Sequence, residues 1–228
     1  MKRETKAQRA ARVARILELL DREYGTDYRC YLNHETPWQL LIAVILSAQC
    51  TDARVNIVTE TLFTRFPTVE SIAEAPVEEI ESIVKSCGFY RVKAHDTKAM
   101  CEMLVKEYGG VVPDTMEDLL RLPGVGRKTA NLVLGDVYGK PAVVCDTHCI
   151  RITNLLGLVH TKDPVKVEKE LRAILDPAES NDFCHRCVLH GRAVCKARRP
   201  YCSLCVLRQY CAYASTGPES AGMAEPEA

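Results

Sequence analysis

Apolar residues recur along most of this chain at the spacing of an amphipathic helix. In the stretch 10–24, for example, Val13, Ile16 and Leu20 fall on one helical face. The same period predicts further helices at 52–66, 69–74, 77–86, 90–108, 116–122, 127–138, 149–156, 164–175 and 181–190. A convincing alternation of apolar and polar residues, which would indicate a strand, is absent. The pattern therefore predicts an all-α fold.

One predicted helix differs from the others because it is apolar on nearly every side. Thr36 is a suitable N-cap and Pro37 favours the first helical position, so this helix is expected to begin there and to run through Ala48. A helix without a polar face has to be covered on all sides. We therefore expect it to lie in the centre of a domain.

Charge is balanced overall but unevenly distributed. The chain carries 30 Lys and Arg residues against 30 Asp and Glu residues, so its net charge does not indicate an anionic partner. Residues 1–15, however, hold six cations and one acid, and residues 183–218 hold six cations and no acid. Such clusters attract phosphates through their local field, although each could also be an ordinary solvated surface.

The clearest motif runs from Leu122 to Asn131 and reads Leu-Pro-Gly-Val-Gly-Arg-Lys-Thr-Ala-Asn. Pro123 and Gly124 end the preceding helix, and Gly126 leads into the next one. A Gly-x-Gly hairpin between two helices leaves backbone N–H groups exposed at the start of the second helix. That arrangement predicts an anion site, suited to a phosphate of a nucleic-acid backbone.

Two cations follow this predicted phosphate site directly. Arg127 would add to the binding of a phosphate, and Lys128 would place an amine beside it. Taken alone, Lys128 is most simply interpreted as a surface cation that binds phosphate. Its position just inside the helix also makes it a candidate nucleophile, which points to chemistry on DNA.

Cysteine is abundant, with 12 residues in 228, which is also a property of secreted disulfide proteins. The first fifteen residues are charged and contain no continuous apolar segment, so no signal peptide is expected. The best apolar run, Leu40 to Leu46, is far too short to span a membrane. We therefore expect reduced thiols in a cytoplasm, apart from any that bind metal.

Four cysteines near the C-terminus predict a metal centre. They are Cys195, Cys202, Cys205 and Cys211. Four thiolates within seventeen residues indicate a closed tetrathiolate site for a metal or an iron–sulfur cluster. Zinc is the competing occupant, because the ligands alone do not distinguish it from a cluster.

The loop between the first two of these cysteines carries three cations, Lys196, Arg198 and Arg199, which would contact phosphate. A nearby pair, Cys184 and Cys187, could form a second metal site together with two neighbouring histidines. That stretch follows a helical period, so an ordinary packed role in a helix is the preferred interpretation.

The hairpin, Lys128, the sequence Asp146-Thr147-His148 and the cysteine spacing together resemble the endonuclease III family. Its members are helix-hairpin-helix DNA glycosylase/lyases that carry a 4Fe–4S cluster. The segments at 41–52 (Leu-Ile-Ala-Val-Ile-Leu-Ser-Ala-Gln-Cys-Thr-Asp) and 88–94 (Gly-Phe-Tyr-Arg-Val-Lys-Ala) strengthen the resemblance. It extends over nearly the whole chain, from about residue 10 to residue 213.

The resemblance implies a two-lobed architecture with DNA across the groove between the lobes. A six-helix barrel would occupy residues 30–140 and would include the hairpin at about 116–138. The cluster lobe would combine residues 1–29 with residues 141–213. The remaining segment, 214–228, is rich in Gly, Pro, Ser, Ala and Glu and is expected to be disordered.

The resemblance also implies a mechanism. Lys128 would attack the sugar C1′ of a damaged nucleotide flipped out of the duplex, forming a Schiff base. An ordinary lysine has a pKa of about 10.4. We expect the helix N-terminus, Arg127 and partial burial to lower that of Lys128. Asp146 would assist deprotonation and stabilise the cationic sugar, although alone it would be interpreted as a helix N-cap.

Further residues are assigned by the same resemblance. Gln49 would fill the gap left by the flipped nucleotide, and Phe89 would wedge between bases where Leu is usual, with core packing as the alternative. Asp52 would lie near the substrate pocket or cap the helix that starts there, and His148 would support the pocket. Cys50 stands where Ala is common and would add sensitivity to oxidation.

The sequence thus predicts a bifunctional DNA N-glycosylase and apurinic/apyrimidinic-site lyase of base excision repair. It would release oxidised pyrimidines from duplex DNA and cleave 3′ of the abasic site by β-elimination. We expect a monomer in a bacterial-type cytoplasm, associated with the nucleoid. One alternative is a monofunctional adenine-mismatch-type glycosylase, disfavoured by Lys128. The other is a non-catalytic DNA-binding module with a structural Cys₄ zinc.

Overall fold

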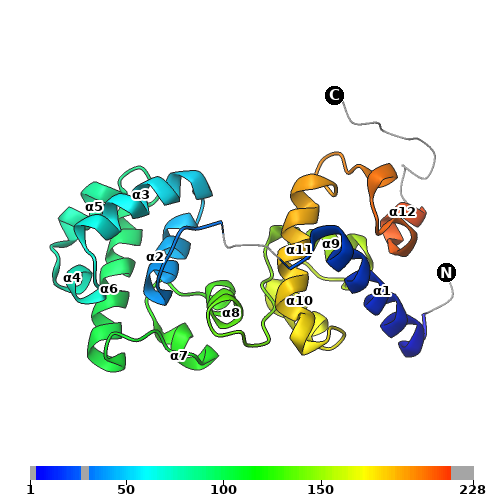
Figure 1. Ribbon diagram of the computed structural model, residues 1–228, viewed down its shortest axis with the longest axis horizontal. Helices are drawn as coiled ribbons and strands as arrows, with labels where there is room; N and C mark the ends of the chain where they lie inside the picture. Colours follow the sequence, from blue (N-terminus) through cyan, green and yellow to red (C-terminus); the bar gives the residue numbers. More distant parts are fainter. Residues whose placement is uncertain (1–3, 27–30, 217–228) are drawn as a thin grey trace. The chain divides into compact units, whose positions relative to one another are not determined.

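The structure, a computed structural model, describes residues 4–26 and 31–216, and within these ranges every regular element is a helix (Figure 1). The predicted all-α class is therefore confirmed. Contacts divide the chain into two compact units, unit 1 (Met1–Tyr28 and Pro141–Ala228) and unit 2 (Arg29–Lys140). In the described part of the chain, each helix is too short or too polar to cross a lipid bilayer.

Unit 2 is built around one buried helix. Its helices are α2 (Pro37–Ser47), α3 (Asp52–Arg65), α4 (Val69–Glu74), α5 (Val77–Val84), α6 (Tyr90–Tyr108), α7 (Met116–Arg121) and α8 (Arg127–Asp136). Helix α2 packs against α3, α6 and α8, as Figure 1 shows. Eight of its eleven residues are buried. This confirms the expected central position of the helix that is apolar on nearly every side.

Unit 1 combines the N-terminal helix with the C-terminal part of the chain. Its helices are α1 (Lys6–Tyr24), α9 (Thr147–Leu155), α10 (Pro164–Arg172), α11 (Ser180–Ala193) and α12 (Ala212–Thr216), with 3₁₀ turns at Pro177–Glu179, Cys202–Leu204 and Arg208–Tyr210. Helix α11 packs against α1 and α9. The contact with α1 includes Arg186, which is 1% exposed and bonds to Asp21 (2.6 Å) and to the carbonyl of Gly25 (3.1 Å).

The observed helix boundaries correct the predicted ones at a few places. Helix α1 begins at Lys6 rather than at residue 10, because Thr5 and Gln8 form a capping box ahead of the apolar spacing. Helix α12 and the 3₁₀ turns were not predicted. Of the tail expected to be disordered, 214–228, the first three residues are helical and those from 217 on lie outside the described residues.

A buried lysine ties the start of α6 to the end of α2. Lys93 is 5% exposed, and its Nζ donates to the carbonyl oxygens of Leu46 (2.9 Å) and Ala48 (2.6 Å). The last carbonyls of a helix lack partners within it, and a cation there also interacts favourably with the helix dipole. The ammonium therefore fixes the place where the chain leaves α2 towards Gln49.

Replacement of Lys93 by Met tests this anchor. Lys93→Met is expected to lower the free energy of unfolding by about 2 kcal/mol, because two carbonyls lose their donor. The matched control is Arg91→Met on the same helix, where the side chain is 74% exposed and a change below about 0.5 kcal/mol is expected. Urea denaturation measures both, and equal losses in the two variants would contradict an anchoring role.

Candidate functional site

The predicted hairpin is present between α7 and α8 of unit 2. Gly124 has φ 73°, in the left-handed region. A Cβ at this position would lie 3.0 Å from Asp96 Cβ and 3.1 Å from Ile45 Cδ1. Both backbone conformation and space therefore require glycine there. Gly126 is extended, and a Cβ on it would meet nothing within 4 Å, so open space adjoins the start of α8.

Helix α8 begins without a side-chain cap and without an acidic residue. Its N-cap is Gly126, and its first turn holds Arg127 and Lys128. The first N–H groups of a helix have no acceptor within it, so they can bind an anion. Lys128 is exposed, and the expectation of partial burial is wrong because the next two residues, Thr129 and Ala130, take the buried positions of this turn.

Asp146 caps helix α9 in unit 1. Its Oδ1 accepts a hydrogen bond from the backbone N–H of Cys149 at 2.7 Å. The capping interpretation kept open from the sequence is thus correct for this oxygen. The cap fixes the orientation of the half-buried carboxylate.

Two exposed residues of unit 2 have strained backbones. Gln49 (φ 54°) and Phe89 (φ 58°) are the only non-glycine residues with positive φ in the described ranges. Such a conformation costs about 1 kcal/mol or more per residue. Phe89 is 68% exposed, so the alternative of core packing is wrong. A Cβ on Gly88 would lie 3.7 Å from the carbonyl oxygen of Gln49, which makes the two loops neighbours.

The remaining predicted pocket residues occupy two different settings. Asp52 is the first residue of α3, but Thr51 caps that helix, so the capping interpretation of Asp52 is wrong. His148 is half-buried in unit 1, with Nδ1 3.3 Å from Arg151 Nη2. A Cβ on Gly191 would lie 2.2 Å from the same Nδ1. Sequence reasoning missed Gly191, because the helix predicted at 181–190 ends one residue before it, whereas α11 continues to Ala193.

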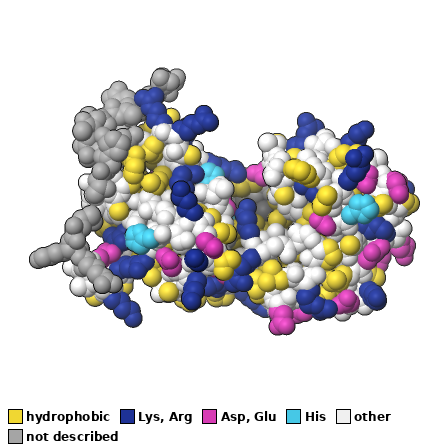
Figure 2. All heavy atoms as spheres, turned by 180° about the vertical axis from the view of Figure 1, so that it is seen from behind, with side chains coloured by type: hydrophobic (Ala, Val, Ile, Leu, Met, Phe, Trp, Pro, Cys, Tyr) yellow, Lys and Arg dark blue, Asp and Glu magenta, His cyan; other side chains and the backbone are white. Residues whose placement is uncertain are grey.

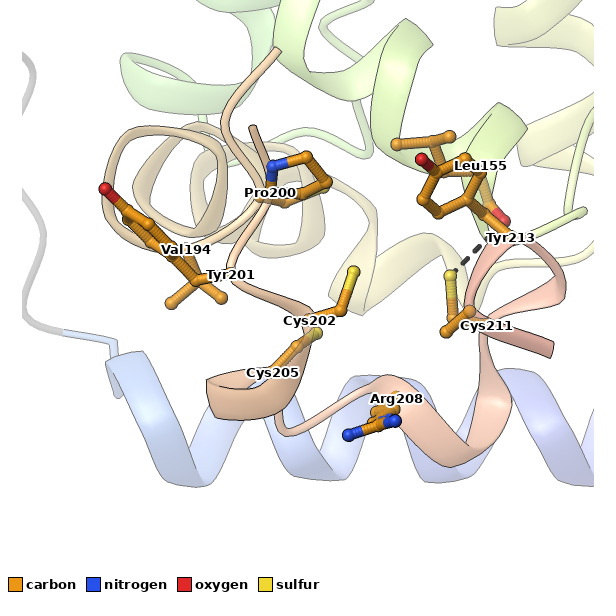
Figure 3. A pocket seen from close by; sticks show the side chains of 11 residues that line it. Leu155, Val194, Pro200, Tyr201, Cys202, Cys205, Arg208, Cys211 and Tyr213 are labelled. Atoms are coloured by element: carbon orange, nitrogen blue, oxygen red, sulfur yellow. Dashed lines mark hydrogen bonds between the residues drawn. The ribbon is translucent and has the colours of Figure 1, made fainter. Parts of the chain in front are cut away.

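The four cysteines of the predicted metal centre line one cavity in unit 1. They are Cys195, Cys202, Cys205 and Cys211, and Figure 3 shows the last three around it. The cavity measures about 20 Å³, and Cys211 Sγ donates to the carbonyl of Leu155 at 3.4 Å. Within the described residues, no three Cys, His, Asp or Glu side chains are arranged to hold a metal ion. The thiols therefore adjoin a shared cavity without forming a ready-made site for one ion.

A buried histidine contacts this set of thiols. His190 is 1% exposed, its Nε2 lies 3.3 Å from Cys205 Sγ, and its Nδ1 lies 2.8 Å from Tyr24 Oη. Burial, and then the charge of Arg151, lower the pKa of His190 to about 4, so its ring is neutral near pH 7. Burial raises the pKa of the Cys205 thiol to about 11.

The other cysteine pair has the packed helical role preferred from the sequence. Cys184 and Cys187 are buried on α11. Their thiols interact with that of Cys149 on α9, the helix against which α11 packs. The three sulfurs thus belong to the contact between these two helices.

The basic residues of the C-terminal cluster differ in their exposure to solvent and in their pairing with acids. Lys196, Arg198 and Arg199 are exposed. Arg186, counted with them in the sequence, is buried and paired with Asp21 at 2.6 Å. Its inclusion among phosphate-binding cations is therefore corrected.

Charge is also separated within unit 2. Residues 69–84, which form α4 and α5, contain five glutamates and no Lys or Arg, and Figure 2 shows acidic side chains gathered at that end of the unit. Residues 122–135, by contrast, contain Arg127 and Lys128 and no acid. Two of these glutamates are paired with cations, Glu79 with Arg65 (2.6 Å) and Glu81 with Arg91 (3.9 Å). The local charge therefore favours the hairpin as the place where a polyanion binds.

Comparison with known proteins agrees with this arrangement. Residues 42–177 match the HhH-GPD superfamily of base excision DNA repair proteins. The endonuclease III of Synechocystis sp. is 44% identical over 206 residues, covering 90% of this chain and 94% of the relative. That of Escherichia coli is 39% identical over 203 residues, covering 88% and 96%.

A solved structure of a trapped endonuclease III–DNA covalent intermediate is 40% identical and superposes with a TM-score of 0.84, over 90% of this chain and 97% of that chain. The fold and the hairpin thus define a base excision repair protein of the HhH-GPD superfamily. Within that superfamily, the chain belongs to the endonuclease III family. The family resemblance inferred from the motifs is confirmed.

The two hairpin glycines are expected to respond differently to substitution. Gly124→Ala should lower the free energy of unfolding by about 1–3 kcal/mol, because the residue combines positive φ with close neighbours. Gly126→Ala should change it by less than about 1 kcal/mol, since the backbone is extended and the space is open. Thermal unfolding of both variants measures the difference. An unchanged free energy of unfolding in Gly124→Ala would refute the close packing of the hairpin.

Proposed function

We propose that this chain is a bifunctional DNA N-glycosylase and apurinic/apyrimidinic-site lyase that releases oxidised pyrimidines from duplex DNA. The observation that carries the proposal is the exposed amine of Lys128 in the first turn of an uncapped helix. One helix start thereby offers a nucleophile and a phosphate site side by side. The covalent intermediate trapped for an endonuclease III supports the same chemistry here.

Gln49 and Phe89 would open the duplex. Both side chains are exposed, and their loops are neighbours in unit 2. An apolar wedge such as Phe89 separates stacked bases, and a polar side chain such as Gln49 satisfies the partner base left behind. The strained backbone at both positions is the type of feature that collects at binding sites.

Lys128 and Asp146 would perform the chemistry. The neutral amine of Lys128 attacks C1′, the damaged base leaves, and the opened sugar forms a Schiff base with Nζ. Loss of a proton from C2′ then breaks the bond to the 3′ oxygen. Asp146, held by its bond to the Cys149 N–H, would accept the amine proton and stabilise positive charge on the sugar. Asp52 and His148 would contribute to the substrate pocket.

Cys195, Cys202, Cys205 and Cys211 would hold a 4Fe–4S cluster. Four thiols beside one cavity match its ligand set, and they need not converge on one point because each binds a different iron. When bound, the cluster cross-links this part of the chain.

The cluster would thereby support a basic loop. Lys196, Arg198 and Arg199 lie between the first two ligands and are exposed. They would contact backbone phosphates, as would the N–H groups at Gly124, Gly126 and Arg127 in unit 2. A DNA substrate is consistent with a cytoplasmic protein, and we expect it to act as a monomer at the nucleoid.

Borohydride trapping tests the nucleophile. Wild-type protein and a duplex with one abasic site should give a covalent adduct, because borohydride reduces the Schiff base. Lys128→Gln and Lys128→Arg should both abolish it. Lys128→Arg should keep its affinity for the duplex within about threefold, since the cation at the phosphate site remains. Adduct formation by Lys128→Arg would identify another nucleophile, and its absence from folded wild type would favour a monofunctional glycosylase or a binding module.

Metal analysis tests the cluster. Purified protein should contain about four iron atoms and four sulfides per chain and absorb visible light. Cys202→Ser should lower the iron content, whereas Cys184→Ser, on the helical pair, should leave it unchanged. About one zinc per chain, without iron, would refute the cluster and support a structural zinc site.

A further inference from the structure

Two thiols outside the proposed metal centre meet where the Gln49 and Phe89 loops touch. Cys50 follows α2 and is half-buried, and Cys87 precedes α6 and is fully buried. Their side chains are close enough to interact, and the residues beside them are neighbours, since a Cβ on Gly88 would lie 3.7 Å from the carbonyl oxygen of Gln49. Each cysteine lies within two residues of one of the two strained, exposed side chains.

The backbone on both sides of this pair is held in place. The Lys93 ammonium binds the carbonyls of Leu46 and Ala48 just before Cys50. The N–H of Cys50 donates to the carbonyl of Ser47 at 3.0 Å, and that of Cys87 donates to the carbonyl of Val84 at 2.8 Å. The thiols therefore stay in contact as a consequence of the fold.

The two thiols differ in reactivity. Burial, and then the neighbouring Cys50, raise the pKa of Cys87 to about 11, so Cys87 remains a protonated thiol near pH 7. Cys50 is the partner that a small solute can reach, because only its side chain is partly exposed. The positive charges of Lys93 and Arg54 act against this rise in the pKa of Cys87 but do not outweigh it.

We propose that Cys50 and Cys87 form a reversible disulfide under hydroperoxide stress and thereby regulate the DNA-contacting loops, an inference that rests on the proposed roles of Gln49 and Phe89. The Cys50 thiolate attacks the peroxide, breaks the O–O bond and becomes a sulfenic acid, with hydroxide as the leaving group. The Cys87 sulfur then attacks the Cys50 sulfur, forming the S–S bond and releasing water. A thiol reductant reverses the step by exchange.

A covalent bond holds two sulfurs at about 2 Å, closer than any non-bonded contact, so the two loops are drawn together. Gln49 and Phe89 are proposed to open the duplex together, and displacements of about 1 Å at such sites cost up to about 100-fold in rate. We expect the oxidised protein to bind abasic-site duplex at least about tenfold more weakly. A disulfide in a reducing compartment is transient, which suits a stress response.

The experiment treats the full-length, cluster-loaded protein with about one equivalent of hydrogen peroxide, as Cys50 consumes one peroxide per disulfide. Free thiols are blocked with N-ethylmaleimide, and a non-reducing digest is analysed by mass spectrometry. Affinity for duplex DNA with a stable abasic-site analogue is measured before oxidation, after it and after dithiothreitol. The expected result is a peptide linking Cys50 to Cys87 and a loss of affinity that dithiothreitol restores.

Cys50→Ala is the matched control, because peroxide damage to the cluster affects it as it affects wild type, and visible absorbance monitors that damage. Cys87→Ala should keep Cys50 as a sulfenic acid without a linked peptide. Absence of the linked peptide, an unchanged affinity despite it, or an equal loss in Cys50→Ala would each overturn the proposal. Failure of the reduced wild type to bind the duplex would refute the proposed function, and the linked peptide would still show whether the disulfide forms.

Discussion

The ammonium of Lys93 is the interaction on which the candidate DNA surface of unit 2 depends. It sits where the central helix α2 ends and α6 begins, and it bonds to the carbonyls of Leu46 and Ala48 at once. A buried lysine needs such hydrogen bonds to offset the loss of its hydration, so the helix end and the cation hold each other. The loops with Gln49 and Phe89 start from this point. The core therefore helps to set the geometry of both loops.

That anchoring explains how two residues persist in an unfavourable conformation. Gln49 and Phe89 have left-handed backbones without being glycines, and both side chains face solvent. Folding alone would favour glycine at these positions, since it adopts positive φ without strain. A side chain kept there at a cost to stability is best explained by what it contacts outside the protein. The same region brings Cys50 against Cys87, so its rigidity also defines its redox chemistry.

Helical periodicity and capping chemistry predicted most of the fold, because both are local properties of the sequence. They located α4 and α6 at the observed residues and identified α2 as buried. Properties set by tertiary packing could not be read in this way. The exposure of Lys128 depends on which face of α8 meets the core, and the neutralisation of Arg186 depends on Asp21, far away in sequence. Lys93 did leave a signal, a lysine where the period of α6 requires an apolar residue.

Net charge was the least useful property of the sequence, and the structure shows why. Cations that bind phosphate are those without acidic partners, and many of the 30 basic residues do have such partners. Arg12 is held by Glu4, and Arg186 by Asp21, so neither adds to a field felt by DNA. Unit 2 holds 15 Asp and Glu residues against 12 Lys and Arg residues, yet residues 122–135 around its hairpin hold two cations and no acid. A neutral chain can therefore bind a polyanion at one face, and its weak field elsewhere limits non-specific attachment.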